Sequence, residues 1–163
     1  MKHRKLIPAS LLLALLFAPV MTAAGMDQSA AHVDVATKLT AAQDDSDARI
    51  IKLRLQIDDG WHVNAHPASL DFLVPTAIQA TVDDETLSPS IDWPAGRDSG
   101  IELDGTTIAV FRDGTTIPVH LTADELASAR TAGRLTLAVQ VQACSDDGIC
   151  LPPSTLETTV TGL

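Results

Sequence analysis

Hydrophobic and polar residues alternate along much of this chain, and the alternation predicts β-strands. It is most regular at residues 51–57, where Ile and Leu alternate with Lys, Arg and Gln, and at residues 135–141, where Leu and Val alternate with Thr, Ala and Gln. A period of two puts one set of side chains on a buried face and the other in water. Shorter strand-like runs predict further strands at residues 33–39, 70–74, 77–82, 107–111, 117–121 and 155–160.

One segment departs from this pattern and predicts a helix. Thr122 and Glu125 fit a capping box, in which each side chain satisfies a backbone donor, and Gly133 is placed to end the helix. Elsewhere, turn-forming stretches such as Asp-Gly separate short strands, which is typical of an antiparallel sandwich. We therefore expect an all-β fold, an antiparallel β-sandwich with one short helix, formed by a single domain at residues 33–163.

The N-terminal residues have the parts of a secretory signal. Basic residues come first, an apolar run of about 15 residues with two prolines follows, and small residues end it at Thr22-Ala23-Ala24. A membrane anchor is the alternative, but a spanning helix needs about 20 apolar residues. We expect a cleaved signal peptide at residues 1–24, a disordered stretch at residues 25–32, and a mature chain that is periplasmic and not inserted in the membrane.

Charge and composition exclude several functions. The 163 residues hold 11 Lys and Arg against 21 Asp and Glu, a net charge of −10, and three of the bases lie in the first five residues. Such an acidic chain is unsuited to nucleic acid or anionic lipid. Gly-x-Gly phosphate loops and serine nucleophile elbows are absent from the sequence, and we expect no cofactor. Two cysteines are too few for a four-thiolate zinc site, but in an oxidising compartment they can pair.

The two cysteines flank a predicted turn. A strand leads into Cys144, five residues that include Asp147-Gly148 reverse the chain, and Cys150 begins the return limb. The two sulfurs can therefore face each other across the mouth of a hairpin. Counting by twos from Thr136 reaches Cys144, so without a bulge its side chain lies on the polar face of the sheet.

This pair has two interpretations. As an inert staple, a disulfide closing so short a loop contributes on the order of 2 kcal/mol. As a redox centre, a disulfide on the polar face beside a turn is open to attack by a thiolate. Asp146 and Asp147 lie beside the cysteines in sequence and are expected to raise the thiol pKa, which would make reaction depend on a docked partner.

Residues 144–153 resemble the C-x5-C-x-P-P segment of the N-terminal periplasmic domain of DsbD, a membrane reductase that carries electrons to periplasmic disulfides. Residues 59–64 and 93–96 add weaker matches. The resemblance implies an immunoglobulin-like sandwich whose cysteine pair accepts electrons from a thioredoxin-like donor and reduces oxidised periplasmic proteins, with Cys150 forming the mixed disulfide. The family also shields its cysteines with a cap loop that has an aromatic tip. The matching piece here, residues 97–105, offers Glu102 and Leu103 as the gate.

Further features of the sequence bear on this assignment. The full family protein continues into a membrane segment and a thioredoxin-like domain, whereas this sequence stops at Leu163, so we expect the donor to be a separate chain. His62 and His66 are four residues apart, but in an extended segment that separation is roughly 13 Å, and we expect no metal site. Trp61 and Trp93 are expected to pack on the core or its rim. A redox-inert interaction module, with a structural disulfide and an acidic binding surface, remains the alternative.

Overall fold

The computed structural model describes residues 28–41 and 49–163, so the signal peptide expected at residues 1–24 lies outside the described residues. Antiparallel strands make up most of this part, joined by one α-helix and one short 3-10 helix, η1. In chain order the elements are η1 (Ser29–Ala31), β1 (Val33–Ala41), β2 (Arg49–Ile57), β3 (Trp61–Asn64), β4 (Ala77–Val82), β5 (Glu85–Leu87), β6 (Ser90–Ile91), β7 (Arg97–Leu103), β8 (Thr106–Phe111), β9 (Thr116–Leu121), α1 (Ala123–Ala132), β10 (Leu135–Val141), β11 (Ala143–Ser145) and β12 (Ser154–Val160).

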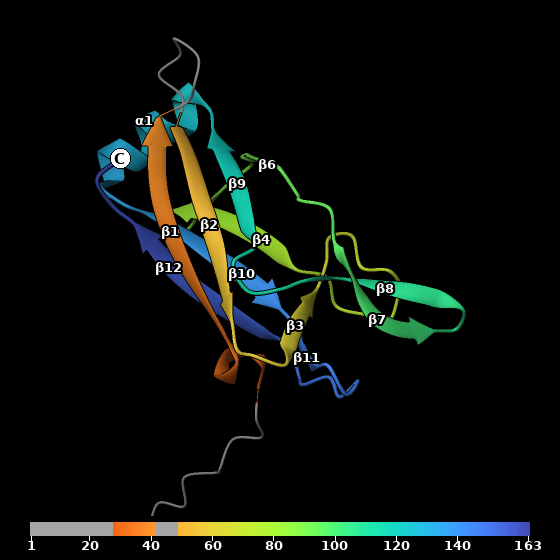
Figure 1. Ribbon diagram of the computed structural model, residues 1–163. Helices are drawn as coiled ribbons and strands as arrows, with labels where there is room; N and C mark the ends of the chain where they lie inside the picture. Colours follow the sequence, from red (N-terminus) through yellow and green to blue (C-terminus); the bar gives the residue numbers. More distant parts are fainter. Residues whose placement is uncertain (1–27, 42–48) are drawn as a thin grey trace, which may run out of the picture.

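Two four-stranded sheets form the sandwich. One has the order β1-β2-β9-β6 and the other β12-β10-β4-β5 (Figure 1). The alternation seen in the sequence explains how the two sheets pack. The inward residues of β2 and β10 are buried in one hydrophobic core, while their neighbours are more exposed. Each fully buried aliphatic side chain contributes about 1.5–3 kcal/mol relative to an exposed one. The predicted all-β sandwich with one short helix is confirmed.

A third sheet, of order β11-β3-β8-β7, carries the cysteines. β11 follows β10 after one residue, but it pairs with β3 instead of continuing beside β4 and β12. Figure 1 shows β3 and β11 at the end of the sandwich near η1, away from α1, while β7 and β8 extend outward as a hairpin. This sheet is the frame of the site.

The structure corrects three local expectations. Residues 70–74 form turns and bends instead of a strand, with the Leu73 N–H donating to the Leu70 carbonyl at 3.1 Å. Residues 97–105, which match the family's cap loop, do not form a loop, because β7 pairs with β8 around a turn at Asp104-Gly105. Within the stretch expected to be disordered, Ser29–Ala31 forms η1 and Ser29 is fully buried.

The helix follows its predicted signals. The Thr122 hydroxyl accepts from the Glu125 backbone N–H at 3.3 Å, and the Glu125 carboxylate accepts from the Thr122 N–H at 2.9 Å. Gly133, with φ of 74°, ends the helix in the left-handed conformation that glycine adopts without strain. The capping box and the glycine stop are therefore confirmed.

Candidate functional site

Cys144 and Cys150 form a disulfide across the mouth of a tight turn, as the hairpin argument predicts. Their Cα atoms are 4.0 Å apart, and the two residues form an antiparallel bridge. Inside the loop, the Ser145 N–H donates to the Ile149 carbonyl at 2.8 Å and the Gly148 N–H donates to the Ser145 carbonyl at 2.9 Å. The loop is thus held by its own backbone as well as by the sulfurs.

The two cysteines differ sharply in exposure. Cys150 is exposed, whereas Cys144 is only 3% exposed. The counted alternation correctly excludes Cys144 from the main core, where its neighbour Ala143 lies. The expectation of an open, polar surface there is wrong, because side chains from β3, from the loop at Leu73 and from the β7–β8 hairpin line a pocket on that face. Of the two cysteines, only Cys150 is therefore exposed to solvent.

A small, mostly apolar pocket of about 70 Å³ lies over the disulfide. Leu103 lines it, as the cap-loop comparison suggests, but Glu102 does not and is exposed elsewhere on the hairpin. Side chains alternate along β7, so Ile101 joins Leu103 at the pocket. The other lining residues are His62, Asn64, Leu73, Ile108 and Gly148, together with both cysteines. No pattern in the sequence predicts Ile108 or Leu73 at the site, whereas the period of two in residues 101–103 is a usable signal for Ile101.

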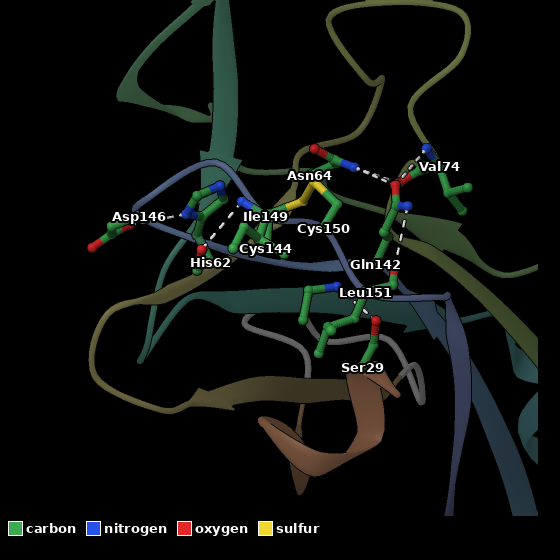
Figure 2. Close-up of a disulfide and its surroundings, with 12 residues drawn as sticks. Ser29, His62, Asn64, Val74, Gln142, Cys144, Asp146, Ile149, Cys150 and Leu151 are labelled. Carbon is green, nitrogen blue, oxygen red and sulfur yellow. Dashed lines mark hydrogen bonds and ion pairs between the residues drawn. A yellow bond between two sulfur atoms is a disulfide. The ribbon is translucent and has the colours of Figure 1, made fainter. Parts of the chain in front are cut away.

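Asp146 is the acceptor of a charged hydrogen-bond network beside the disulfide. The His62 Nδ1–H donates to Asp146 Oδ1 at 3.0 Å (Figure 2). Arg112 donates to both carboxylate oxygens at 2.9 and 3.2 Å. The hydrogen bond from His62, then that from Arg112, holds the pKa of Asp146 below its usual value. Asp147 is exposed, and its carboxylate has no hydrogen bond or ion pair to other described residues. The two acidic residues therefore have different surroundings.

The lowered pKa gives a stability prediction. Because the folded-state pKa of Asp146 lies below its unfolded-state value, its contribution to the free energy of unfolding is present above about pH 4 and is lost as pH falls through the folded-state pKa. Asp146→Asn is expected to be less stable than the wild type at pH 7, with the difference shrinking below about pH 4. Urea unfolding at both pH values measures this, and a difference that grows in acid would contradict it.

Two further polar side chains, Gln142 and Ser29, connect the site to the rest of the fold, and no sequence pattern predicts either. Gln142 Oε1 accepts from the buried Asn64 Nδ2 at 3.1 Å and from the Val74 N–H at 3.2 Å (Figure 2). The Ser29 hydroxyl donates to the Pro152 carbonyl and accepts from the Ala143 N–H, both at 2.8 Å. These bonds fix the strand before Cys144 and the segment after Cys150.

The two candidate histidines point to different partners. His62 forms a hydrogen bond with Asp146. The His66 Nδ1–H instead donates to the Thr76 carbonyl at 2.9 Å, and its ring stacks on Trp93 with ring centroids 4.1 Å apart. No group of three or more His, Cys, Asp or Glu side chains within residues 28–41 and 49–163 could hold a metal ion. Trp61 and Trp93 pack partly buried against the core, as expected.

A comparison with models of protein families shows which family the chain belongs to. The family model for the N-terminal domain of the thiol:disulfide interchange protein DsbD matches residues 27–162. The chain belongs to this DsbD N-terminal family. Membership, together with the bonded cysteine pair, makes it a thiol-disulfide exchange domain in general terms. The search of curated proteins finds no match.

Two solved structures of N-terminal domains of this type are similar to the chain. The N-terminal periplasmic domain of ScsB from Proteus mirabilis is 18% identical with a TM-score of 0.51, covering 77% of this chain and 45% of that one. This chain therefore spans less than half the length of the ScsB chain. The reduced N-terminal domain of DsbD from Neisseria meningitidis is 17% identical with a TM-score of 0.46, covering 84% of this chain and 90% of that one. The two sheets, together with the likeness to the ScsB domain, confirm the expected immunoglobulin-like sandwich. Among the described residues of this DsbD-type domain, no helix has the length and apolar character needed to cross a bilayer.

Proposed function

We propose that this domain works in the periplasm, accepts electrons from a thioredoxin-like donor, and reduces disulfides of oxidised periplasmic proteins. Cys144 and Cys150 would cycle between the dithiol and the disulfide. The observation that carries the proposal is the asymmetry of the pair, in which an exposed Cys150 is bonded to a buried Cys144 beneath an apolar pocket. A structural staple has no need of such an opening.

The asymmetry supports different roles for the two sulfurs. In the reduced domain, the Cys150 thiolate attacks a partner disulfide, forming a mixed disulfide and releasing one partner thiolate. Cys144 then attacks the Cys150 sulfur, and the second partner thiolate leaves. Two electrons pass from the cysteine pair to the partner, which becomes a dithiol after taking up two protons. Loading the domain with electrons is the reverse sequence, with a reduced thioredoxin-like donor attacking Cys150.

Exposed apolar side chains near Cys150 support a protein as the partner. Ile149, next to Cys150 in the turn, and Phe72, next to the pocket residue Leu73, are each 65% exposed, and Leu103 is 38% exposed. These three are the large hydrophobic residues exposed in the described part of the chain. Exposed apolar side chains beside a reactive group favour docking of a macromolecule over access by small reductants alone.

Shielding of the disulfide by the β7–β8 hairpin belongs to the same proposal. Leu103 and Ile101 line the pocket over the sulfurs, whereas Glu102 does not. If this hairpin gates access, Leu103→Ser should raise the rate at which dithiothreitol reduces the disulfide. Glu102→Gln, one residue away, serves as the matched control and should leave that rate unchanged. Equal rates in all three proteins would exclude the gate.

The equilibrium potential of the pair tests the function directly. A disulfide that exchanges with partner proteins is expected to lie above about −300 mV, since purely structural disulfides lie below that value. Equilibration with glutathione or dithiothreitol, read by mass spectrometry, gives the potential. A value below about −300 mV, together with no mixed disulfide from periplasmic extract, would favour the redox-inert module with a structural bond.

A further inference from the structure

A buried histidine faces the buried cysteine across the third sheet. His62 in β3 is the direct register partner of Cys144 in β11, and the two residues are 2% and 3% exposed. Side chains of directly opposed residues share one face, with Cβ atoms about 4.5–5.5 Å apart. Both side chains line the pocket that also contains Cys150. The imidazole is therefore within reach of the reacting sulfurs.

The orientation of this ring is fixed by Asp146. Because Nδ1–H donates to the carboxylate at 3.0 Å, the proton of a neutral ring lies on Nδ1 and Nε2 keeps its lone pair. Nε2 has no hydrogen bond to other described residues, and Figure 2 shows the ring between Asp146 and the cysteines. An acceptor nitrogen thus lies in a pocket whose reaction requires loss of a thiol proton.

Few charged groups surround the imidazole of His62. From the disulfide loop, Asp146 supplies a carboxylate, and Arg112, just after β8, keeps that carboxylate ionised. From β7, β8 and the loop after β3, the pocket receives only the apolar side chains of Ile101, Leu103, Ile108 and Leu73. The titratable groups facing His62 in the described part of the chain are therefore Asp146 and the two cysteines, with Arg112 behind Asp146.

We propose that His62, held by Asp146, accepts the proton of the Cys144 thiol and so generates the thiolate that resolves the mixed disulfide. The inference rests on the proposed function. In the step, the S–H proton of Cys144 moves to Nε2, the Cys144 thiolate forms a bond to the Cys150 sulfur, and the bond from Cys150 to the partner breaks. The partner sulfur leaves with the electron pair as a thiolate. The imidazolium then returns its proton to that thiolate or to water.

A chromogenic disulfide, dithionitrobenzoate, separates the two chemical steps. Mixed in stoichiometric amount with the reduced domain, it releases one coloured thiolate when Cys150 attacks and a second when Cys144 resolves the adduct. His62→Gln is expected to slow the second release about 10- to 30-fold at pH 7, because an unassisted thiol of pKa about 8.5 is only a few per cent ionised there. The first release should change less than about twofold, and the defect should shrink as the pH rises, because more of the thiol then ionises without a base.

His120→Gln is the matched control. His120 also bonds an aspartate, through Nε2 to Asp92 at 2.8 Å, but it lies in β9 of another sheet and should leave both releases unchanged. Asp146→Asn, at a half-exposed position, is the second variant and should slow the second release by a smaller factor. If His62→Gln does not fold, as judged by circular dichroism, the Asp146→Asn result decides the proposal.

The outcomes separate this inference from the function on which it rests. Two releases from the wild type, with an unchanged second release in His62→Gln at every pH, would overturn the role of His62 and leave the exchange function standing. Equal slowing of both releases with no pH dependence would also overturn it, since that is the signature of a structural role. No release from the wild type would instead contradict the proposed function itself.

Discussion

Replacing Cys144 with serine is expected to abolish disulfide reduction and to leave Cys150 joined to its partner in a stable mixed disulfide. Cys150 is exposed and can still attack, but the buried sulfur that would release the partner is gone. The loss of turnover should be complete, because no other cysteine exists in the chain. Mixing the reduced variant with oxidised periplasmic extract and analysing the products by non-reducing electrophoresis and mass spectrometry measures the adduct.

Cys150→Ser is the matched control for this experiment. It keeps one cysteine, but that cysteine is 3% exposed beneath the pocket, so adducts should be scarce. Adducts that form with Cys150→Ser and not with Cys144→Ser would reverse the proposed roles. Adducts that form with neither variant, while the wild-type potential lies in the structural range, would remove the exchange function.

The sequence predicts most of the sandwich because its strands follow local rules. Residues 51–57 and 135–141 alternate without a break, and each alternating set has a core to enter, so period and burial agree. The helix was predictable for a similar reason, since its start and end are marked by Thr122, Glu125 and Gly133. The cysteine turn could also be predicted, because a strand, an Asp-Gly reversal and a second cysteine leave few other geometries.

The parts that sequence reasoning misses depend on long-range contacts. Residues 70–74 are apolar except for Asp71, which predicts a strand, but Leu73 lines the cysteine pocket from a segment of turns and bends. β7 is polar along much of its length and becomes a strand only by pairing with β8. Burial of Cys144 has the same origin, because the residues that cover it come from distant segments. The link between His62 and Asp146 spans 84 positions, so no local pattern could indicate it.

The largest stability effect is expected from Phe111→Ala, at the join between the cysteine-bearing sheet and the sandwich. Phe111 is 1% exposed, pairs with Val63 of β3 in register, and stacks on Trp93 with ring centroids 6.4 Å apart. Truncating such a side chain removes its burial and leaves a cavity, which costs about 3–5 kcal/mol. Since domains of this kind have only about 5–15 kcal/mol of stability, the loss would be a large part of it.

Phe72→Ala isolates the burial effect from the change of residue type. Phe72 is 65% exposed, so its truncation should change the free energy of unfolding by about 0.5 kcal/mol or less. Urea unfolding of both variants with the disulfide intact gives the comparison, and an unchanged m-value would assign the difference to the folded state's stability.

The chain continues from Phe111 directly into Arg112, which binds Asp146, so loosening β8 should also weaken the network that orients His62. Equal stabilities of the two variants would mean that the third sheet does not depend on Phe111 for its attachment to the core.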